Sequence, residues 1–191
     1  MEGASLGTWA SRWWQWAKNP AVGKDPVLDE TGAFASVGQD YRFPVWFLAG
    51  SYYTTPIKRK CEVPEGRPLF FPIINTLGGA CFSSPTFDCL QLRMEARNDM
   101  AKVQKIYFKL DGESLENPEK YYEESPDCFQ VKSNNPKKGF AAGFWVMLKP
   151  LPAGQHVLQF GADAPGFFSQ NIEYLITVKP AGTLSVGLGK N

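Results

Sequence analysis

The sequence predicts a single, mainly β domain: an antiparallel β-sandwich of immunoglobulin-like or jelly-roll topology with two α-helices. Three observations predict it. Several segments alternate apolar and polar residues with period two, as strands with one buried face do. The chain holds 18 glycines and 15 prolines, which supply frequent turns between short segments. Its 191 residues fit one domain, expected at residues 1–179 with a flexible tail at 180–191, and no βαβ rhythm or internal repeat is present.

The first helix is expected at about residues 5–18. Ser5 or Thr8 can cap its start, and Asn19-Pro20 ends it. Trp14 falls outside the apolar face, so we expect it to be the more exposed ring. The face itself is expected to dock on the core and consists of Leu6, Trp9, Trp13 and Trp16.

The second helix is expected at about residues 85–102 and interrupts a run of strands. Ser84-Pro85 is typical of a helix start, as an N-cap followed by a first-turn proline. Its expected buried face consists of Phe87, Leu90, Met94 and Ala101.

Strands are expected in the segments between the helices and after them. Pro72 would cost a ladder hydrogen bond, so its strand is expected to lie at an edge or to be bulged there. Long irregular segments are expected at residues 19–42 and 75–84, and residues 118–124 favour a helical turn. The clearest strand patterns lie at residues 45–49, 59–63, 69–74, 106–110, 128–132, 144–149, 156–160 and 172–178.

Composition and charge exclude several function classes. The net charge is +1, which gives no basic surface for nucleic acid. No run of 18 apolar residues exists, so no membrane span is expected. Glu2 stands where a signal peptide carries basic residues, and Ser11-Arg12 and Gln15 interrupt any apolar region, so the N-terminus is not expected to be a signal peptide. Whether a leader was removed before Met1 is left open. The localisation is therefore left open, with a secreted or extracytoplasmic place favoured if a leader existed.

The four cysteines lack the spacing of a structural metal site. Cys61, Cys81, Cys89 and Cys128 contain no CxxC pair, so zinc binding is not expected. Their even number allows up to two disulfides, and it also suits a reduced cytosolic protein. The pairing is left open.

Six short motifs are spread along the chain: Trp13-Trp14-Gln15-Trp16-Ala17, Gly38-Gln39, Val45-Trp46-Phe47-Leu48-Ala49-Gly50, Cys61-x-Val63-Pro64-x-Gly66, Leu69-x-Phe71-Pro72-Ile73 and Leu148-x-Pro150-Leu151-Pro152-x-Gly154-x-His156. Together they resemble a family of uncharacterised bacterial proteins, many of them secreted, that carry a WWxW helix and a VWFLAG strand. Members often have a cysteine shortly before the Gly-Gln, where this chain has Ala35-Ser36, so the resemblance implies that Cys61 lacks a familiar partner. It implies no known activity and no catalytic residues.

The candidate catalytic residues are few: His156, Asp88 and Glu95. His156 is the single histidine, so any Ser-His-Asp or Cys-His arrangement must use it. It is more simply read as a partly buried histidine bonded to backbone. Asp88 and Glu95 share a helical face about 10 Å apart, too far for a retaining glycosidase pair. No nucleophile elbow, phosphate loop or dinucleotide fingerprint occurs, so no cofactor and no metal are expected.

Aromatic and amide side chains suggest ligand binding instead. Sugars stack their C–H faces on aromatic rings and bond their hydroxyls to amides and carboxylates. Gln39 and Asn75 adjoin two buried strands, so they are expected near one rim of the sandwich. The candidate ligand-binding residues are Gln39, Trp46, Tyr52, Tyr53, Asn75 and Arg93.

Three functional hypotheses follow. The first is a non-enzymatic module that binds a carbohydrate or a small amphipathic molecule. The second is a small metal-independent hydrolase or cyclase-like isomerase, with a carboxylate or His156 as acid/base in a rim pocket. The third is a homo-oligomer that assembles through strand edges or the Trp helix. A shallow aromatic-lined groove would favour the binding module. A deep pocket with converging polar groups would favour the enzyme, and a large apolar patch would favour the homo-oligomer.

Overall fold

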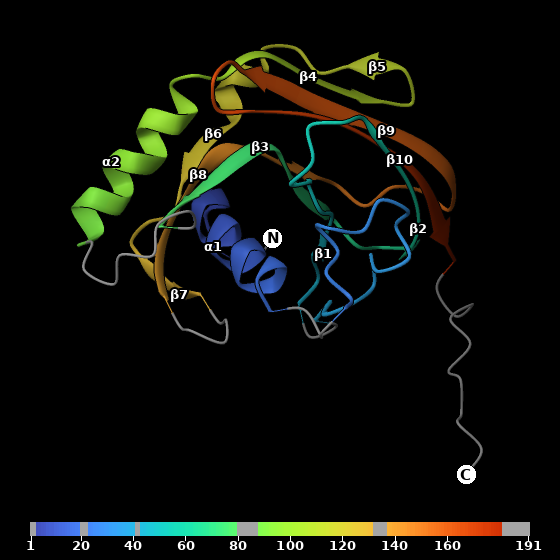
Figure 1. Ribbon diagram of the computed structural model, residues 1–191. Coiled ribbons are helices and arrows are strands. Elements are labelled where there is room, and N and C mark those ends of the chain that lie inside the picture. The colour runs from blue at the N-terminus through green and yellow to red at the C-terminus, as the bar shows by residue number, and fades with distance from the viewer. Residues whose placement is uncertain (1–2, 20–22, 41–42, 80–87, 132–136, 181–191) are drawn as a thin grey trace.

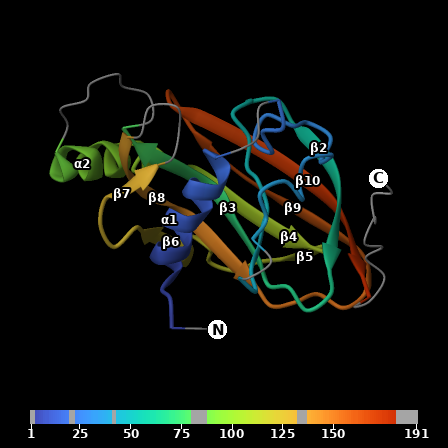
Figure 2. The same ribbon diagram turned by 90° about the horizontal axis from the view of Figure 1, so that it is seen from below.

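A computed structural model describes residues 3–19, 23–40, 43–79, 88–131 and 137–180, and two five-stranded sheets pack face to face in it (Figures 1 and 2). The first sheet has the order β1 (Trp46–Phe47), β3 (Leu69–Gly78), β8 (Lys137–Leu148) and β6 (Tyr122–Glu124), and β7 (Phe129–Val131) also pairs with β8. The second sheet has the order β2 (Ile57–Pro64), β10 (Phe168–Lys179), β9 (Gly154–Ala164), β4 (Gln104–Leu110) and β5 (Glu113–Ser114). The predicted mainly β sandwich with two helices is confirmed.

Both sheets are mixed rather than wholly antiparallel. The β1–β3 and β2–β10 pairs are parallel, and the other pairs are antiparallel. Strand β3 lies between β1 and β8, but β1 pairs only with Leu69 and Phe70, so no ladder to β1 is present at Pro72. The register of β3 against β8 shifts between Pro72 and Ile74, so the predicted bulge is present. The end of the β1 pairing before Pro72 and the bulge after it together allow this strand to carry a proline.

Several element boundaries differ from the expected ones. The strand expected at 45–49 shortens to two residues, although the whole segment is buried. Strand β3 continues to Gly78, into the expected 75–84 loop, because residues 75–78 pair with β8. The expected helical turn is present as the short 3-10 helix Pro118–Tyr121. The predicted tail beyond Pro180 lies outside the described residues.

Aromatic rings fill the space between the two sheets. Phe71 of β3 lies 4.8 Å from Phe160 of β9 and 5.8 Å from Phe108 of β4, measured between ring centroids. Phe160 stacks in turn on Tyr174 of β10. All four rings are buried, so the period-two apolar positions of four strands meet in one core.

Helix α1 (Leu6–Ala17) packs on the other face of the first sheet (Figures 1 and 2). Ser5 caps its start as expected. Trp13 lies 5.5 Å from Trp145, which stacks on Phe70. Trp14 is only 5% exposed, so the prediction of an exposed ring was wrong. It packs edge-on against Trp13, which shows that the buried face of α1 is wider than one stripe.

Helix α2 (Cys89–Met100) closes one end of the sandwich and buries an unexpected face. Leu90 and Met94 are 64% and 55% exposed, so the predicted buried face was wrong. The residues that pack against Phe140 and Ala142 of β8 are Leu92, Ala96 and Met100. The expected helix start at Ser84-Pro85, with Phe87, lies outside the described residues, and Asp88 is the observed N-cap. Among the described residues, no helix is long and apolar enough to cross a membrane.

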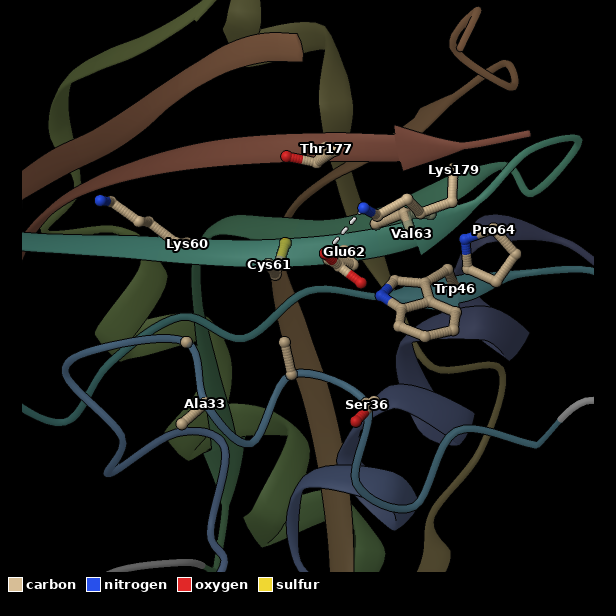
Figure 3. A pocket seen from close by; sticks show the side chains of 12 residues that line it. Ala33, Ser36, Trp46, Lys60, Cys61, Glu62, Val63, Pro64, Thr177 and Lys179 are labelled. Atoms are coloured by element: carbon tan, nitrogen blue, oxygen red, sulfur yellow. Dashed lines mark ion pairs between the residues drawn. The ribbon is translucent and has the colours of Figure 1, made fainter. Parts of the chain in front are cut away.

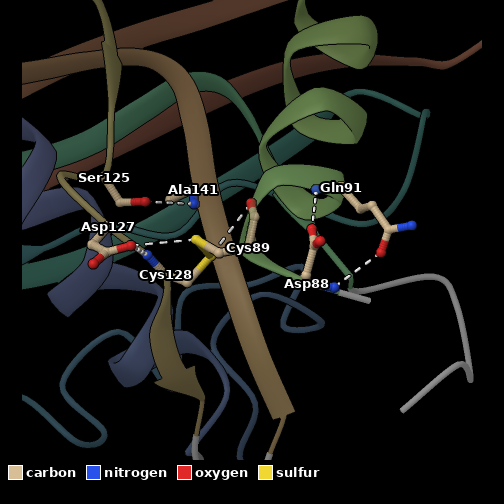
Figure 4. Close-up of a disulfide and its surroundings, with 7 residues drawn as sticks. All are labelled: Asp88, Cys89, Gln91, Ser125, Asp127, Cys128 and Ala141. Atoms are coloured by element: carbon tan, nitrogen blue, oxygen red, sulfur yellow. Dashed lines mark hydrogen bonds between the residues drawn. A yellow bond between two sulfur atoms is a disulfide. The ribbon is translucent and has the colours of Figure 1, made fainter. Parts of the chain in front are cut away.

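A disulfide joins Cys89 at the start of α2 to Cys128 just before β7 (Figure 4). Asp127 beside it accepts a hydrogen bond from the Cys128 amide at 2.7 Å. One of the two disulfides that the cysteine count allowed is therefore formed. Cys61 is a buried free thiol, and Cys81 lies outside the described residues.

The irregular segment before β1 is held by a buried arginine, Arg59 of β2. Only 2% of Arg59 is exposed, and it points into the molecule from the edge strand of the second sheet. A buried charge is tolerated only when it is well hydrogen-bonded. Its guanidinium donates to four backbone carbonyl oxygens and one hydroxyl, those of Val27, Asp29, Ala49, Gly50 and Tyr174.

Removal of the disulfide is expected to destabilise the fold. The Cys89–Cys128 bond spans 39 positions of sequence, and the loop-entropy model gives about 4 kcal/mol for a loop of that size. The Cys89→Ser/Cys128→Ser double variant should therefore unfold at lower urea than the wild type. A reductant should shift the wild type toward the variant and leave the variant where it is. Equal urea midpoints for the two proteins would contradict the stabilising role.

Candidate functional site

A surface hollow of about 580 Å³, which we call the edge pocket, lies beside edge strand β2 and is the larger of the two hollows described here (Figure 3). Strand β2 and the end of β10 form one wall, residues 32–36 form the facing wall, and Trp46 closes one end. Volumes of this size are typical of small-molecule sites. The lining residues are Gly32, Ala33, Ala35, Ser36, Trp46, Lys60, Cys61, Glu62, Val63, Pro64, Thr177 and Lys179.

The floor of the edge pocket is apolar. Ala35, Cys61 and Val63 line it, and these three, like Trp46 at the end of the pocket, belong to the core between the sheets. Burial raises the pKa of the Cys61 thiol to about 12, and the nearby positive charge of Arg59 only partly opposes this effect. Cys61 is therefore a neutral apolar surface near neutral pH rather than a nucleophile.

The rim of the edge pocket is charged. Lys179 of β10 pairs with Glu62 of β2 at 3.0 Å between Nζ and Oε1 (Figure 3). Lys60 lies on the same side, and Ser36 supplies a hydroxyl from the facing wall. With two lysines and one glutamate, the rim carries a net positive charge. The pocket thus combines an apolar floor with a polar, cationic rim.

Backbone contacts join the two walls. The Lys60 amide donates to the Thr31 carbonyl at 2.8 Å. At Gly32, with φ +89°, a side-chain Cβ would lie 2.2 Å from the Lys60 carbonyl oxygen, so only glycine lets the two segments approach this closely. Burial opposes ionisation of Asp29, but hydrogen bonds from Phe34 and Thr31 lower its pKa overall, and they fix the turn.

Gln39, a predicted ligand-binding residue, has a structural role in the facing wall. Its Nε2 donates to the carbonyls of Ala35 and Phe47 at 2.9 and 2.8 Å, and its Oε1 accepts from the Phe47 amide at 3.0 Å. The Gln39 side-chain amide therefore satisfies both the N–H and the C=O of Phe47, as a neighbouring strand would. Trp46, also predicted, does line the pocket.

The other predicted ligand-binding residues line neither hollow described here. Tyr52 and Tyr53 are exposed between β1 and β2, where the Lys18 ammonium lies 4.6 Å from the Tyr52 ring. Asn75 lies in β3 opposite Gly143. Arg93 of α2 places its guanidinium 4.9 Å from the Phe140 ring. These residues are dispersed, so they do not form one site.

The predicted catalytic carboxylates are engaged at different points of α2. Asp88 forms a capping box with Gln91, in which each side chain bonds the other residue's backbone amide (Figure 4). Glu95 accepts a hydrogen bond from the Gly79 amide at 2.8 Å. Neither carboxylate lines a hollow described here, and His156 lies on β9 of the second sheet.

His156 joins the start of β9 to the turn after β4. Its Nδ1 lies 2.8 Å from Oδ2 of Asp111, and its Nε2 lies 3.0 Å from the Pro152 carbonyl oxygen. The predicted backbone bond is present, and Asp111 is an additional partner. Only the doubly protonated ring donates to both oxygens. Partial burial favours the neutral ring, but the bonds to Asp111 and Pro152 outweigh it and raise the pKa of His156.

The smaller hollow lies on the outer face of the second sheet, with a volume of about 470 Å³. None of the predicted site residues lines it. The sequence does contain one indication of this hollow: Tyr107 alternates with the apolar Ile106 and Phe108, so it is expected on the outer face of its strand. Its neighbours on other strands depend on the strand order, which a single sequence does not give.

The fold defines the chain as a two-sheet β-sandwich with a tryptophan-rich helix on one face. No protein-family model matches it, and no curated protein matches its sequence. A chain from the structure of PbICP-C in complex with falcipain-2 aligns with 68% of this chain and 93% of its own length. Its identity is 10% and its TM-score is 0.29, so the likeness supports no conclusion about fold or function.

The His156–Asp111 contact is expected to make stability depend on pH. A raised histidine pKa stabilises the fold below the ordinary value of about 6.5. This stabilisation is lost as the pH rises through the raised pKa. The Asp111 side chain is 46% exposed, so the loss should be below about 1 kcal/mol. Urea unfolding at several pH values should show this loss of unfolding free energy in the wild type and not in His156→Gln. Equal pH dependence of the unfolding free energy in the two proteins would contradict the stabilising role of the contact.

Proposed function

We propose that this protein binds a small amphipathic molecule in the edge pocket. The observation that carries the proposal is the arrangement of an apolar floor beneath a charged rim in one open pocket of about 580 Å³. A ligand with an apolar body can lie on the apolar lining of the pocket, where Ala33 and Pro64 are at least partly exposed, which favours binding through the hydrophobic effect.

The rim favours an anionic head group. Lys60 and Lys179 stand against one carboxylate, Glu62, so a negative group gains more than it loses there. Ser36 and Thr177 supply hydroxyls that can bond the same head group. The ligand class is therefore an apolar body with a carboxylate, sulfonate or phosphate end.

The alternative, a small metal-independent enzyme, lacks support from a specific arrangement. Asp88, Glu95 and His156 do not converge, and the raised pKa of Cys61 disfavours its use as a nucleophile. An extracytoplasmic location is part of our proposal, because disulfides such as Cys89–Cys128 persist mainly in oxidising compartments.

The probe for this proposal is 1-anilinonaphthalene-8-sulfonate, which has an apolar ring system and an anionic end. We expect its fluorescence to rise on binding to the folded protein. Ser36→Phe should fill the mouth of the edge pocket with a large ring and weaken binding by about tenfold or more. The measurement is a fluorescence titration on proteins whose thermal unfolding is unchanged.

Ser114→Phe is the matched control, because Ser114 is exposed on β5 and does not line the edge pocket. It adds the same ring to the surface and should bind the probe as the wild type does. Lys179→Gln removes a positive charge from the rim. It should therefore lower the affinity for the anionic probe more than the affinity for its neutral analogue, N-phenyl-1-naphthylamine. If the wild type does not bind the probe, or if both phenylalanine variants bind it equally, the proposal fails.

A further inference from the structure

The outer face of the second sheet carries an ordered set of polar side chains. Along β4, β9 and β10, the residues that alternate with the buried core residues point away from the first sheet. Neither α1 nor α2 belongs to this face, since both pack against strands of the first sheet. The hollow on this face, here called the sheet-face hollow, draws on four adjacent strands and is lined by Pro56, Ile57, Lys58, Tyr107, Lys109, Gln159, Asn171 and Glu173.

The Tyr107 ring is held against the sheet. Tyr107 of β4 lies opposite Gly161 of β9, where a side-chain Cβ would lie 2.1 Å from the Gln170 carbonyl oxygen and 2.9 Å from the Tyr107 ring. Glycine therefore leaves the space in which the ring rests. The Tyr107 hydroxyl donates to Oδ1 of Asn171 on β10 at 2.7 Å, which fixes the ring at its far end. The ring remains partly exposed.

A second set of bonds orients the neighbouring amide. Nε2 of Gln159 donates to Oε2 of Glu173 at 2.7 Å, and Lys58 pairs with Oε1 of the same carboxylate at 3.2 Å. The hydrogen bonds from Gln159 and Lys58 lower the pKa of Glu173, so it stays ionised near neutral pH. The three side chains come from three adjacent strands, β9, β10 and β2.

These bonds leave specific groups available. Oδ1 of Asn171 and Nε2 of Gln159 are used, so Nδ2 of Asn171 remains a donor and Oε1 of Gln159 remains an acceptor. Within the described part of the chain, neither group has a hydrogen-bond partner. The hollow thus offers one ring face with a donor and an acceptor in fixed orientations, and Lys109 adds a further donor.

We propose that the sheet-face hollow binds a pyranose sugar. The sugar's C–H face stacks on Tyr107, and vicinal hydroxyls, each both donor and acceptor, pair with Nδ2 of Asn171 and Oε1 of Gln159. Preorganised side chains lose little entropy on binding, which favours recognition of a polar ligand. The volume of about 470 Å³ fits a small-ligand site. This site shares no lining residue with the edge pocket, so the two proposals are independent.

The first experiment screens the purified chain on an array of plant, bacterial and animal oligosaccharides. The best-bound glycan is then titrated into 15N-labelled protein while the side-chain amide signals of Asn171 and Gln159 are followed. We expect both signals to shift. Tyr107→Ala and Asn171→Ala should each weaken binding by about tenfold, with unchanged amide spectra elsewhere.

Tyr53→Ala is the matched control, because Tyr53 is an exposed tyrosine outside the sheet-face hollow, and it should bind as the wild type does. If Tyr107→Ala does not fold, Tyr107→Phe replaces it: it keeps the ring but loses the bond to Asn171, and should bind more weakly. The bound glycan should leave 1-anilinonaphthalene-8-sulfonate in place, which separates this site from the edge pocket. The proposal is overturned if no glycan binds, or if Tyr107→Ala and Asn171→Ala bind the glycan with the affinity of the wild type.

Discussion

A buried cation, the Arg59 guanidinium, holds the irregular segment before β2 against the regular sheets. It bonds backbone carbonyls from two stretches of the segment before β2, and in the described residues it forms no ion pair with a carboxylate. Carbonyl oxygens in such a segment lack strand partners, and each would be costly to bury unsatisfied. One side chain with five N–H donors meets this need and satisfies its own charge at the same time.

The edge pocket depends on this arrangement. Its facing wall, residues 32–36, follows directly after Asp29, whose carbonyl accepts from Arg59. The Tyr174 hydroxyl accepts from Arg59 and donates to the Ala49 carbonyl, and so extends the network to β10, the strand next to β2. Gln39 joins the facing wall to β1, because its side chain bonds both Ala35 and Phe47. Gln39, which the sequence suggested for ligand contact, therefore acts to hold the facing wall in place.

The sequence predicted the sandwich because period-two alternation reports directly which strand face is buried. The sequence also indicates that Arg59 is unusual. It alternates in step with the apolar Ile57, Cys61 and Val63, so it is a charged residue at a position that points into the core. The buried face of α2 was mispredicted, because its helix carries few apolar residues and contacts with β8 decide which side is covered. The sheet-face hollow was missed, because Tyr107, Gln159 and Asn171 meet only through strand order and register.

The most direct test of the role of Arg59 is amide hydrogen exchange in the wild type and in Arg59→Met, which keeps much of the side chain's volume and removes its donors. We expect faster exchange at residues 27–40 and 43–51 in the variant, while the β3–β8 and β9–β10 amides keep their protection. An unchanged pattern at residues 27–40 and 43–51, or an equal loss of protection across both sheets, would contradict it.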